Sequence, residues 1–203
     1  MPNISRIAAV AVVALSSGIA NTAVAFEPGD WLFRVGASNV DPRSNNSDIV
    51  SVDSATSLTF NFSYMMTDVW AVEVLAAYPF KHDISLVGGP KVGSTKHLPP
   101  TVSLQYHFRP TAKLQPYLGF GINYTNFFSE KTTGPLEGTK LSLDDSWGLA
   151  GQIGFDVMMN DKWFLNLDAR YIGIEPKAKL DGVSLGKVEI DPWIYGAHVG
   201  FRF

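Results

Sequence analysis

Apolar and polar residues alternate along much of this chain with a period of two. From Trp193 to the terminal Phe203, every second residue is apolar, and those between are mostly glycine or polar. This is the pattern of a β-strand with one apolar and one polar face. Seven upstream segments repeat it, so we expect an all-β chain of eight strands. The other strands are predicted within residues 31–38, 58–64, 70–78, 98–108, 118–125, 146–157 and 163–172.

The connections between the predicted strands alternate in length. Short turns are expected at residues 67–68, 109–115 and 160–161, and long loops at 42–53, 83–96, 129–140 and 176–187. Short periplasmic turns and long external loops are typical of bacterial outer-membrane barrels. The sequence therefore predicts an eight-stranded antiparallel transmembrane β-barrel with both termini on the periplasmic side.

Alternation alone also fits a soluble barrel with an apolar interior that holds a ligand. The positions of the lysines favour the membrane barrel, because a lysine facing lipid at mid-bilayer costs roughly 2 to 4 kcal/mol. All ten lysines fall in loops, turns or strand ends. Aromatic residues also gather at the strand ends, as expected for the two interfacial belts of a membrane protein.

Residues 1–25 have the features of a cleaved signal peptide. Arg6 is their only charged residue, an apolar stretch follows it, and Ala23-Val24-Ala25 supplies the small residues of a cleavage site. We expect cleavage after Ala25, which leaves residues 26–203 as one barrel domain. That removes one of 16 basic residues and none of 19 acidic ones, so the formal charge changes from -3 to -4. Such a mild charge gives no reason to expect a nucleic-acid partner.

Six charged residues fall at inward positions of the predicted strands. An eight-stranded barrel is only just wide enough for its own side chains, so a water-filled pore is not expected. Buried charges need partners, and we therefore interpret these residues as a structural network in the lumen. They are Arg34, Glu73, Asp156, Asp168, Arg170 and Arg202.

Four apolar residues interrupt the otherwise polar inward rows: Leu75, Phe127, Phe164 and Ile172. One hypothesis is that they line a path for apolar solutes, with apolar loop residues at its mouth. Ordinary packing of the plug and loops would use the same residues, so both interpretations stay open.

Three prolines suggest a weak seam in the barrel wall. Proline cannot donate to a strand ladder, and Pro79, Pro99 and Pro100 all lie toward the outer end of one hairpin. An apolar solute could leave sideways into lipid at such a seam. A plain loop boundary or bulge is the alternative.

Catalysis is not expected. Ser103 and His107 share the inward face of one strand, but they stand about 13 Å apart along it, beyond hydrogen-bond reach. The four histidines are scattered and cysteine is absent, so neither a metal site nor a cofactor is predicted.

Several separate motifs resemble the OmpW family of small outer-membrane proteins, and the likeness covers the whole mature chain. The motifs are His97-Leu98-Pro99-Pro100-Thr101, the run from Gly121 to Phe128, Asp145-Ser146-Trp147-Gly148, Asp191-Pro192-Trp193 and the terminal Phe203. The resemblance implies an eight-stranded barrel in the bacterial outer membrane with a narrow, partly apolar channel. That channel is proposed to pass small hydrophobic molecules, and family members include alkane-uptake proteins.

Transport of small hydrophobic solutes, with lateral release into the bilayer, is thus the expected function. The partners would be outer-membrane lipids, such solutes, and the barrel-assembly machinery acting through Phe203. The alternative is a plugged structural barrel that displays its loops to phage, hosts or antibodies, since the same fold serves both functions.

Overall fold

The computed structural model describes residues 26–43, 49–108 and 112–203. The signal peptide expected at residues 1–25 lies outside the described residues, as do parts of two expected connections, at 44–48 and 109–111.

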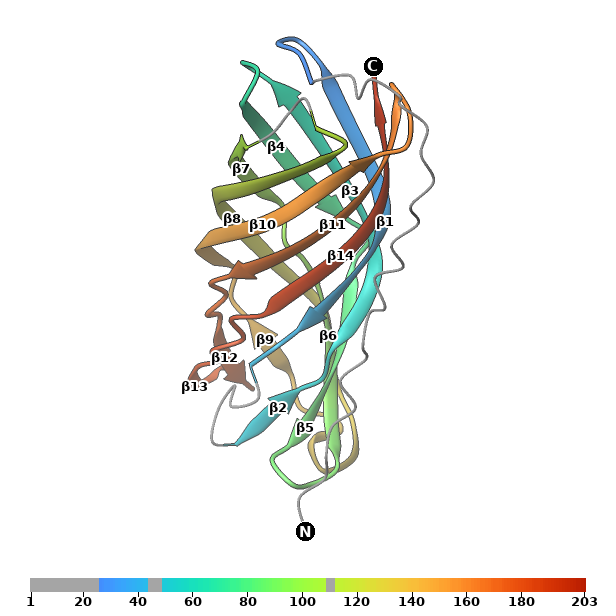
Figure 1. Ribbon diagram of the computed structural model, residues 1–203. Helices are drawn as coiled ribbons and strands as arrows, with labels where there is room; N and C mark the ends of the chain where they lie inside the picture. Colours follow the sequence, from blue (N-terminus) through green and yellow to red (C-terminus); the bar gives the residue numbers. More distant parts are fainter. Residues whose placement is uncertain (1–25, 44–48, 109–111) are drawn as a thin grey trace.

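Eight antiparallel strands form a closed barrel (Figure 1). In the order of pairing they are β10, β11, β14, β1, β3, β4, β7 and β8, and β8 pairs with β10 to close the wall. The predicted fold class is confirmed. The strand bounds are β1 (Trp31–Asp41), β3 (Ala55–Met65), β4 (Trp70–Ala77), β7 (Thr101–His107), β8 (Leu114–Thr132), β10 (Ser146–Met158), β11 (Trp163–Ile172) and β14 (Trp193–Arg202).

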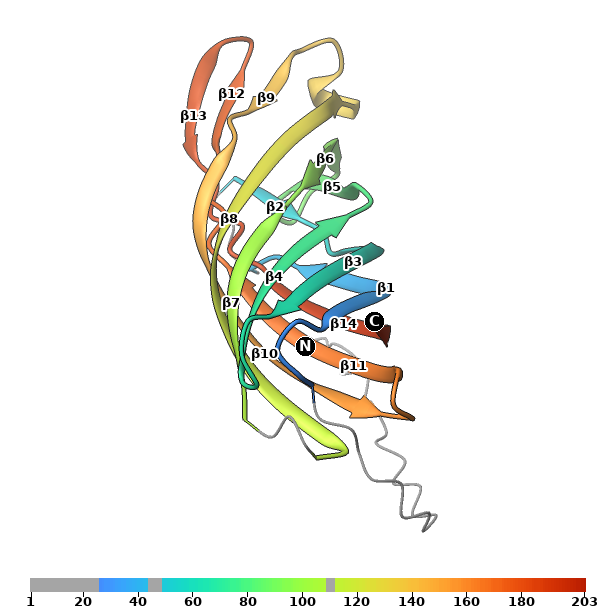
Figure 2. The ribbon, with the colours of Figure 1, turned by 90° about the horizontal axis from the view of Figure 1, so that it is seen from above.

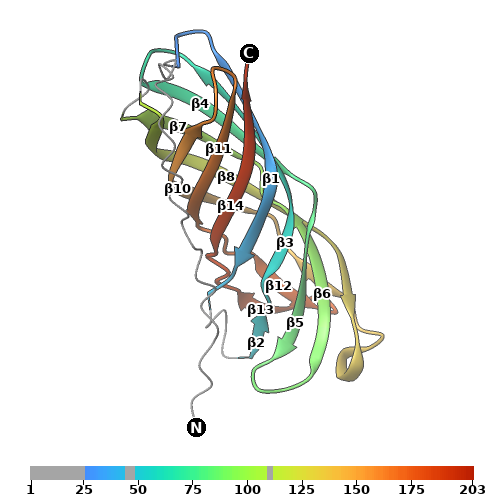
Figure 3. The same ribbon diagram turned by 45° about the vertical axis from the view of Figure 1, so that its right-hand side comes forward.

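The connections at one end of the barrel contain further strands, so the expectation of plain long loops is wrong. Figure 3 shows β2, β5, β6, β12 and β13 beyond one end of the barrel, whereas the carboxyl terminus lies at the other. Figure 2 shows β9 beside β12 and β13, near the end of the long strand β8. The bounds are β2 (Val50–Val52), β5 (Phe80–Leu86), β6 (Lys91–Leu98), the short 3-10 helix η1 (Gly134–Leu136), β9 (Leu141–Leu143), β12 (Lys177–Leu180) and β13 (Val183–Lys187).

Local chemistry explains two of these differences. Asp181 and Gly182 have φ angles of 49° and 83°, which suit a two-residue hairpin turn between β12 and β13. Leu98, expected in the fourth barrel strand, instead ends β6. Pro99 and Pro100 interrupt the strand there because neither residue has an N–H to donate.

The two faces of the wall differ as the alternation predicts. Inward residues such as Arg34, Asn61 and Gln105 are fully buried, whereas outward residues such as Phe120 and Leu149 are more than 60% exposed. Exposed apolar residues cover the barrel strands, far more than a water-soluble surface tolerates. Among the described residues, no helix is long and apolar enough to cross a bilayer.

The barrel interior has three layers, and β1 contributes to each of them. Leu32 belongs to an inner cluster near the short turns, Arg34 to a polar middle layer, and Val40 to an outer cluster near the added strands. The inner cluster is Phe26, Leu32, Met65, Ala71, Met158 and Phe164. The outer cluster is Val40, Ala55, Phe80, Phe127, Ala150, Ile172, Ile174, Ala178, Val188, Ile190 and Ile194.

Candidate functional site

The four apolar residues predicted to line a path lie at different depths of the interior. Phe127 and Ile172 belong to the outer cluster. Leu75 is buried where the ladder between β4 and β7 ends, opposite Thr101. Phe164 lies in the inner cluster, at the far end of the lumen. The structure therefore brings two of the four together in one cluster, and it places Phe164 apart from them.

An aromatic wall continues the outer cluster on β5, β6 and β8. The rings of Phe80 and His82 lie 5.4 and 4.9 Å from that of His97, both stacked at 18°, and the ring of Phe127 lies 5.7 Å from it. The sequence indicates Phe127 but not that it joins the rings of Phe80, His82 and His97, because the composition of residues 83–96 hides the hairpin that brings these rings together. The alternation of buried Phe80, His82 and Ile84 with polar residues between them was the available signal.

Both histidines of this wall are neutral at ordinary pH. Burial is the main cause that lowers the pKa of His82, and burial lowers that of His97 to about 3. The Nδ1 of His82 lies 2.5 Å from the backbone oxygen of Asp53 and donates to it, since a carbonyl can only accept. The wall therefore presents uncharged rings to the outer cluster. In the described part of the chain, no three His, Cys, Asp or Glu side chains form a group that could hold a metal.

Ion pairs cross the lumen in the polar middle layer. Arg34 on β1 donates two hydrogen bonds to Asp156 on β10, at 3.1 and 2.8 Å, and lies 3.6 Å from Glu73 on β4. Arg170 on β11 contacts Glu73 at 2.7 Å and Asp168 at 2.6 Å. Because β1 does not pair with β10, nor β4 with β11, these side chains bridge the lumen between separated strands.

Arg202, the sixth charged residue predicted for the network, lies at the inner rim of the barrel. The Nε atom of Arg202 is 2.9 Å from Asp30, and both side chains are 15% exposed. Arg202 pairs with Leu32 across the β1–β14 ladder, at the level of the inner cluster. It therefore stands below the middle layer that holds the other five charges.

The inner cluster closes the end of the lumen that faces the short turns. Phe26 is 1% exposed, and its ring makes edge contacts with those of His107 and Phe164, both at 5.7 Å. Phe164 in turn lies beneath the guanidinium of Arg34, at 5.3 Å. No sequence signal points to Phe26, because it precedes the first strand and no periodicity marks it.

The three prolines coincide with a break in the ladder of the wall. The β4–β7 pairing ends at Leu75–Thr101, and the β5–β6 pairing begins at Phe80–His97. Between these two pairs, one side of the break has four residues, 76–79, and the other side has three, 98–100. One extra residue is typical of a bulge, and the prolines leave this stretch with few donors.

The neighbouring ladders continue past this break. On the β3 side, the N–H of Tyr78 donates to the backbone oxygen of Leu58 at 2.8 Å. On the β8 side, the N–H of Tyr124 donates to the oxygen of Pro100 at 3.0 Å. The interruption therefore belongs to a single seam between β4 and β7, beside the outer cluster.

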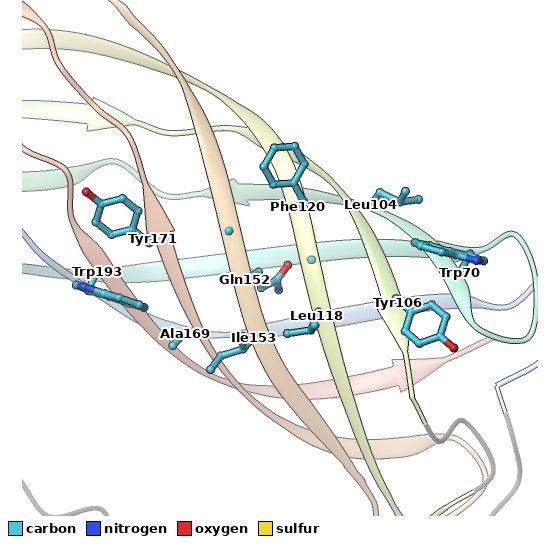
Figure 4. Close-up of a pocket in the computed structure, with 12 residues that line it drawn as sticks. Trp70, Leu104, Tyr106, Leu118, Phe120, Gln152, Ile153, Ala169, Tyr171 and Trp193 are labelled. Atoms are coloured by element: carbon cyan, nitrogen blue, oxygen red, sulfur yellow. The ribbon is translucent and has the colours of Figure 1, made fainter.

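A groove of about 610 Å³ lies on the outside of the wall (Figure 4). Gly151 and Ala169 leave room there between larger side chains, among them Trp70, Phe120 and Tyr171. Those three are 40 to 63% exposed, so they line the outer surface and not the lumen. In a membrane, acyl chains fill such a groove.

Comparisons with known proteins agree with this architecture. The sequence profile of the OmpW family matches residues 27–203. Outer membrane protein W of Vibrio cholerae is 42% identical over 198 residues, covering 88% of this chain and 91% of that protein. The dibenzothiophene metabolism operon protein PahQ of Pseudomonas aeruginosa is 26% identical, covering 87% and 90% of the two chains. The crystal structure of OprG from Pseudomonas aeruginosa has a TM-score of 0.80 at 36% identity, covering 88% of this chain and 98% of that one. The chain thus belongs to the OmpW family, and it is a β-barrel protein of the bacterial outer membrane.

Proposed function

We propose that this barrel forms a narrow channel for the passage of small hydrophobic molecules across the outer membrane, with lateral release into the bilayer. A solute would enter among the outer cluster, with Leu75, Phe127 and Ile172 along its path, and leave at the seam of Pro79, Pro99 and Pro100. The observation that carries the proposal is the break in the β4–β7 ladder beside an apolar cluster.

Two further observations support lateral release. The ion pairs of the middle layer and the inner cluster around Phe26 both obstruct the axial route to the periplasm. Release of an apolar molecule into lipid is also more favourable than release into periplasmic water. The difference in free energy is about 25 cal/mol per Å² of its apolar surface. The name of PahQ ties that relative to the metabolism of dibenzothiophene, which is an apolar compound.

Charged substitutions test the path itself. In cells that make Leu75→Arg or Ile172→Asp, uptake of a hydrophobic fluorescent probe should fall toward that of cells lacking the barrel. Asp68→Arg, at an exposed residue of the short turn between β3 and β4, is the matched control and should leave uptake unchanged. Undiminished uptake by correctly folded Leu75→Arg and Ile172→Asp proteins would refute this path.

A reversible cross-link tests the seam. The chain has no cysteine, so Ala76→Cys with Pro100→Cys would create one disulfide across the break. Uptake should be lost on oxidation and recover with reductant. Val74→Cys with Val102→Cys joins directly paired residues of the same two strands, and this control should transport in both states. Full transport with the seam locked would exclude lateral exit there.

A sealed display barrel is the competing function, and the ion pairs across the middle layer favour it. It predicts no difference in probe uptake between cells with and without the wild-type barrel. We propose no catalytic role, and a phospholipid turnover assay with purified protein tests that point.

We also propose that the barrel-assembly machinery recognises Phe203. Its side chain is 63% exposed, whereas its backbone is fixed by two 3.0 Å hydrogen bonds with Trp31. Phe203→Ala should therefore reduce the amount of barrel assembled in cells without changing how the purified protein refolds in detergent.

A further inference from the structure

Two lysines face each other on the outer side of the hairpin formed by β5 and β6. Lys81 pairs directly with Lys96 in the ladder, and both are exposed. Their neighbours Phe80, His82, Thr95 and His97 are at most 3% exposed and point inward. Side chains alternate along a strand, so both ammonium groups lie on the face that continues the lipid-facing wall.

This pair of cations has no acidic partner among the described residues. The nearby carboxylate of Asp83 is already paired with Lys91, at 2.6 Å. Like charges directly opposite each other destabilise a sheet. A bound anion would convert this unfavourable pair into a favourable site, since a lysine binds phosphate as a compact point charge.

The height of the pair above the membrane core indicates which anion it meets. Tyr78, an aromatic residue 68% exposed at the outer end of β4, lies three residues before Lys81, so the two residues are at most about 10 Å apart along the chain. With strands tilted by about 45°, this amounts to at most roughly 7 Å along the membrane normal. The headgroup layer of a bilayer is about 5 to 7 Å thick on each side, so both ammonium groups lie among the headgroups.

We propose that Lys81 and Lys96 bind the phosphate of an anionic lipid in the outer leaflet. An acidic protein partner fits less well, because the pair faces sideways along the wall. The acyl chains of such a lipid would run down the wall beside the break between Ala76 and Pro100. This site is independent of the proposed transport, because it needs only the outward pair and the membrane location.

Lipid retention by the purified full-length barrel tests this proposal. The protein is placed in phosphatidylcholine nanodiscs that contain either a diphosphorylated glycolipid or its phosphate-free form, and retained lipids are measured by native mass spectrometry. Wild type should retain the phosphorylated form selectively. Lys81→Gln with Lys96→Gln should weaken this retention by about 30-fold, because each lysine near an anionic surface contributes about a 5-fold effect. Retention should also fall with added salt.

Lys113→Gln with Lys162→Gln is the matched control, since it removes the same charge from exposed periplasmic positions. It should retain lipid like wild type, and the heat-dependent gel mobility of each variant verifies its fold. Equal retention by all three proteins, or retention without regard to phosphate, would overturn the proposal. Competition by free inorganic phosphate at millimolar concentration would show that the site lacks lipid selectivity and would also overturn it. If Lys81→Gln with Lys96→Gln changed the fraction of barrel dimers and left lipid retention unchanged, the pair would contact a second copy of the chain, and the proposal would likewise be overturned.

Discussion

Arg34 is a fully buried cation in the polar layer of the barrel, held by carboxylates from two other strands. Its inward direction could be predicted from the alternation along the first strand. Its partner Asp156 could not, because the two residues are 122 positions apart and meet only across the closed lumen.

Arg34→Met should lower the free energy of unfolding by about 3 to 5 kcal/mol, because it leaves buried carboxylates without their partner. Lys91→Met is the control: it breaks an ion pair whose side chains are 44% and 40% exposed, and it should cost less than about 1 kcal/mol. Urea unfolding in lipid vesicles measures both. Equal losses would contradict the view that the middle layer depends on desolvated pairs.

Burial of His97 should make the free energy of unfolding depend on pH. Its folded pKa of about 3 lies below the ordinary 6.5, so the unfolded chain binds the extra proton between these values. Stability should therefore fall as the pH drops below about 6.5, and His97 alone should contribute about 2 kcal/mol of that loss by pH 5. His97→Gln should remove that share of the pH dependence in urea titrations near pH 7 and pH 5. An unchanged dependence would mean that the ring is not buried as a neutral group.

At the scale of elements, the external hairpin of β12 and β13 depends on a turn signal that stands in the sequence. Asp181-Gly182 is a strong two-residue turn signal, yet residues 176–187 were expected to be a loop because their composition is polar and glycine-rich. The exposure of β13 explains why this strand could not be predicted from alternation, since all five of its residues are open to solvent. A strand with no buried face has no alternation to reveal it.

Gly182→Val should fray this hairpin, since a β-branched residue is strained at a φ of 83°. Amide hydrogen exchange should accelerate in β12 and β13. The amides of the barrel strands β11 and β14, measured in the same sample, serve as the internal control and should keep their protection. Faster exchange throughout the barrel would instead mean that the hairpin helps to hold the wall together.

For the whole molecule, the surrounding medium determines how an exposed apolar residue affects the free energy of unfolding. Ile153 on β10 and Val183 on β13 are 57% and 68% exposed, but one faces acyl chains and the other the external medium. Ile153→Arg should lower the free energy of unfolding in vesicles by about 2 to 4 kcal/mol, whereas Val183→Arg should change it by less than about 0.5 kcal/mol. Similar small effects at both positions would place the wall in water and contradict the membrane barrel.

The sequence alone determined the eight strands, the direction of their side chains and the apolar outer wall, because a period of two is a local property of each strand. The tertiary structure decided which side chains meet. Phe26 seals the inner end, His82 and His97 stack in the outer wall, and Lys81 faces Lys96. These contacts depend on strand register and barrel width, which no local pattern encodes.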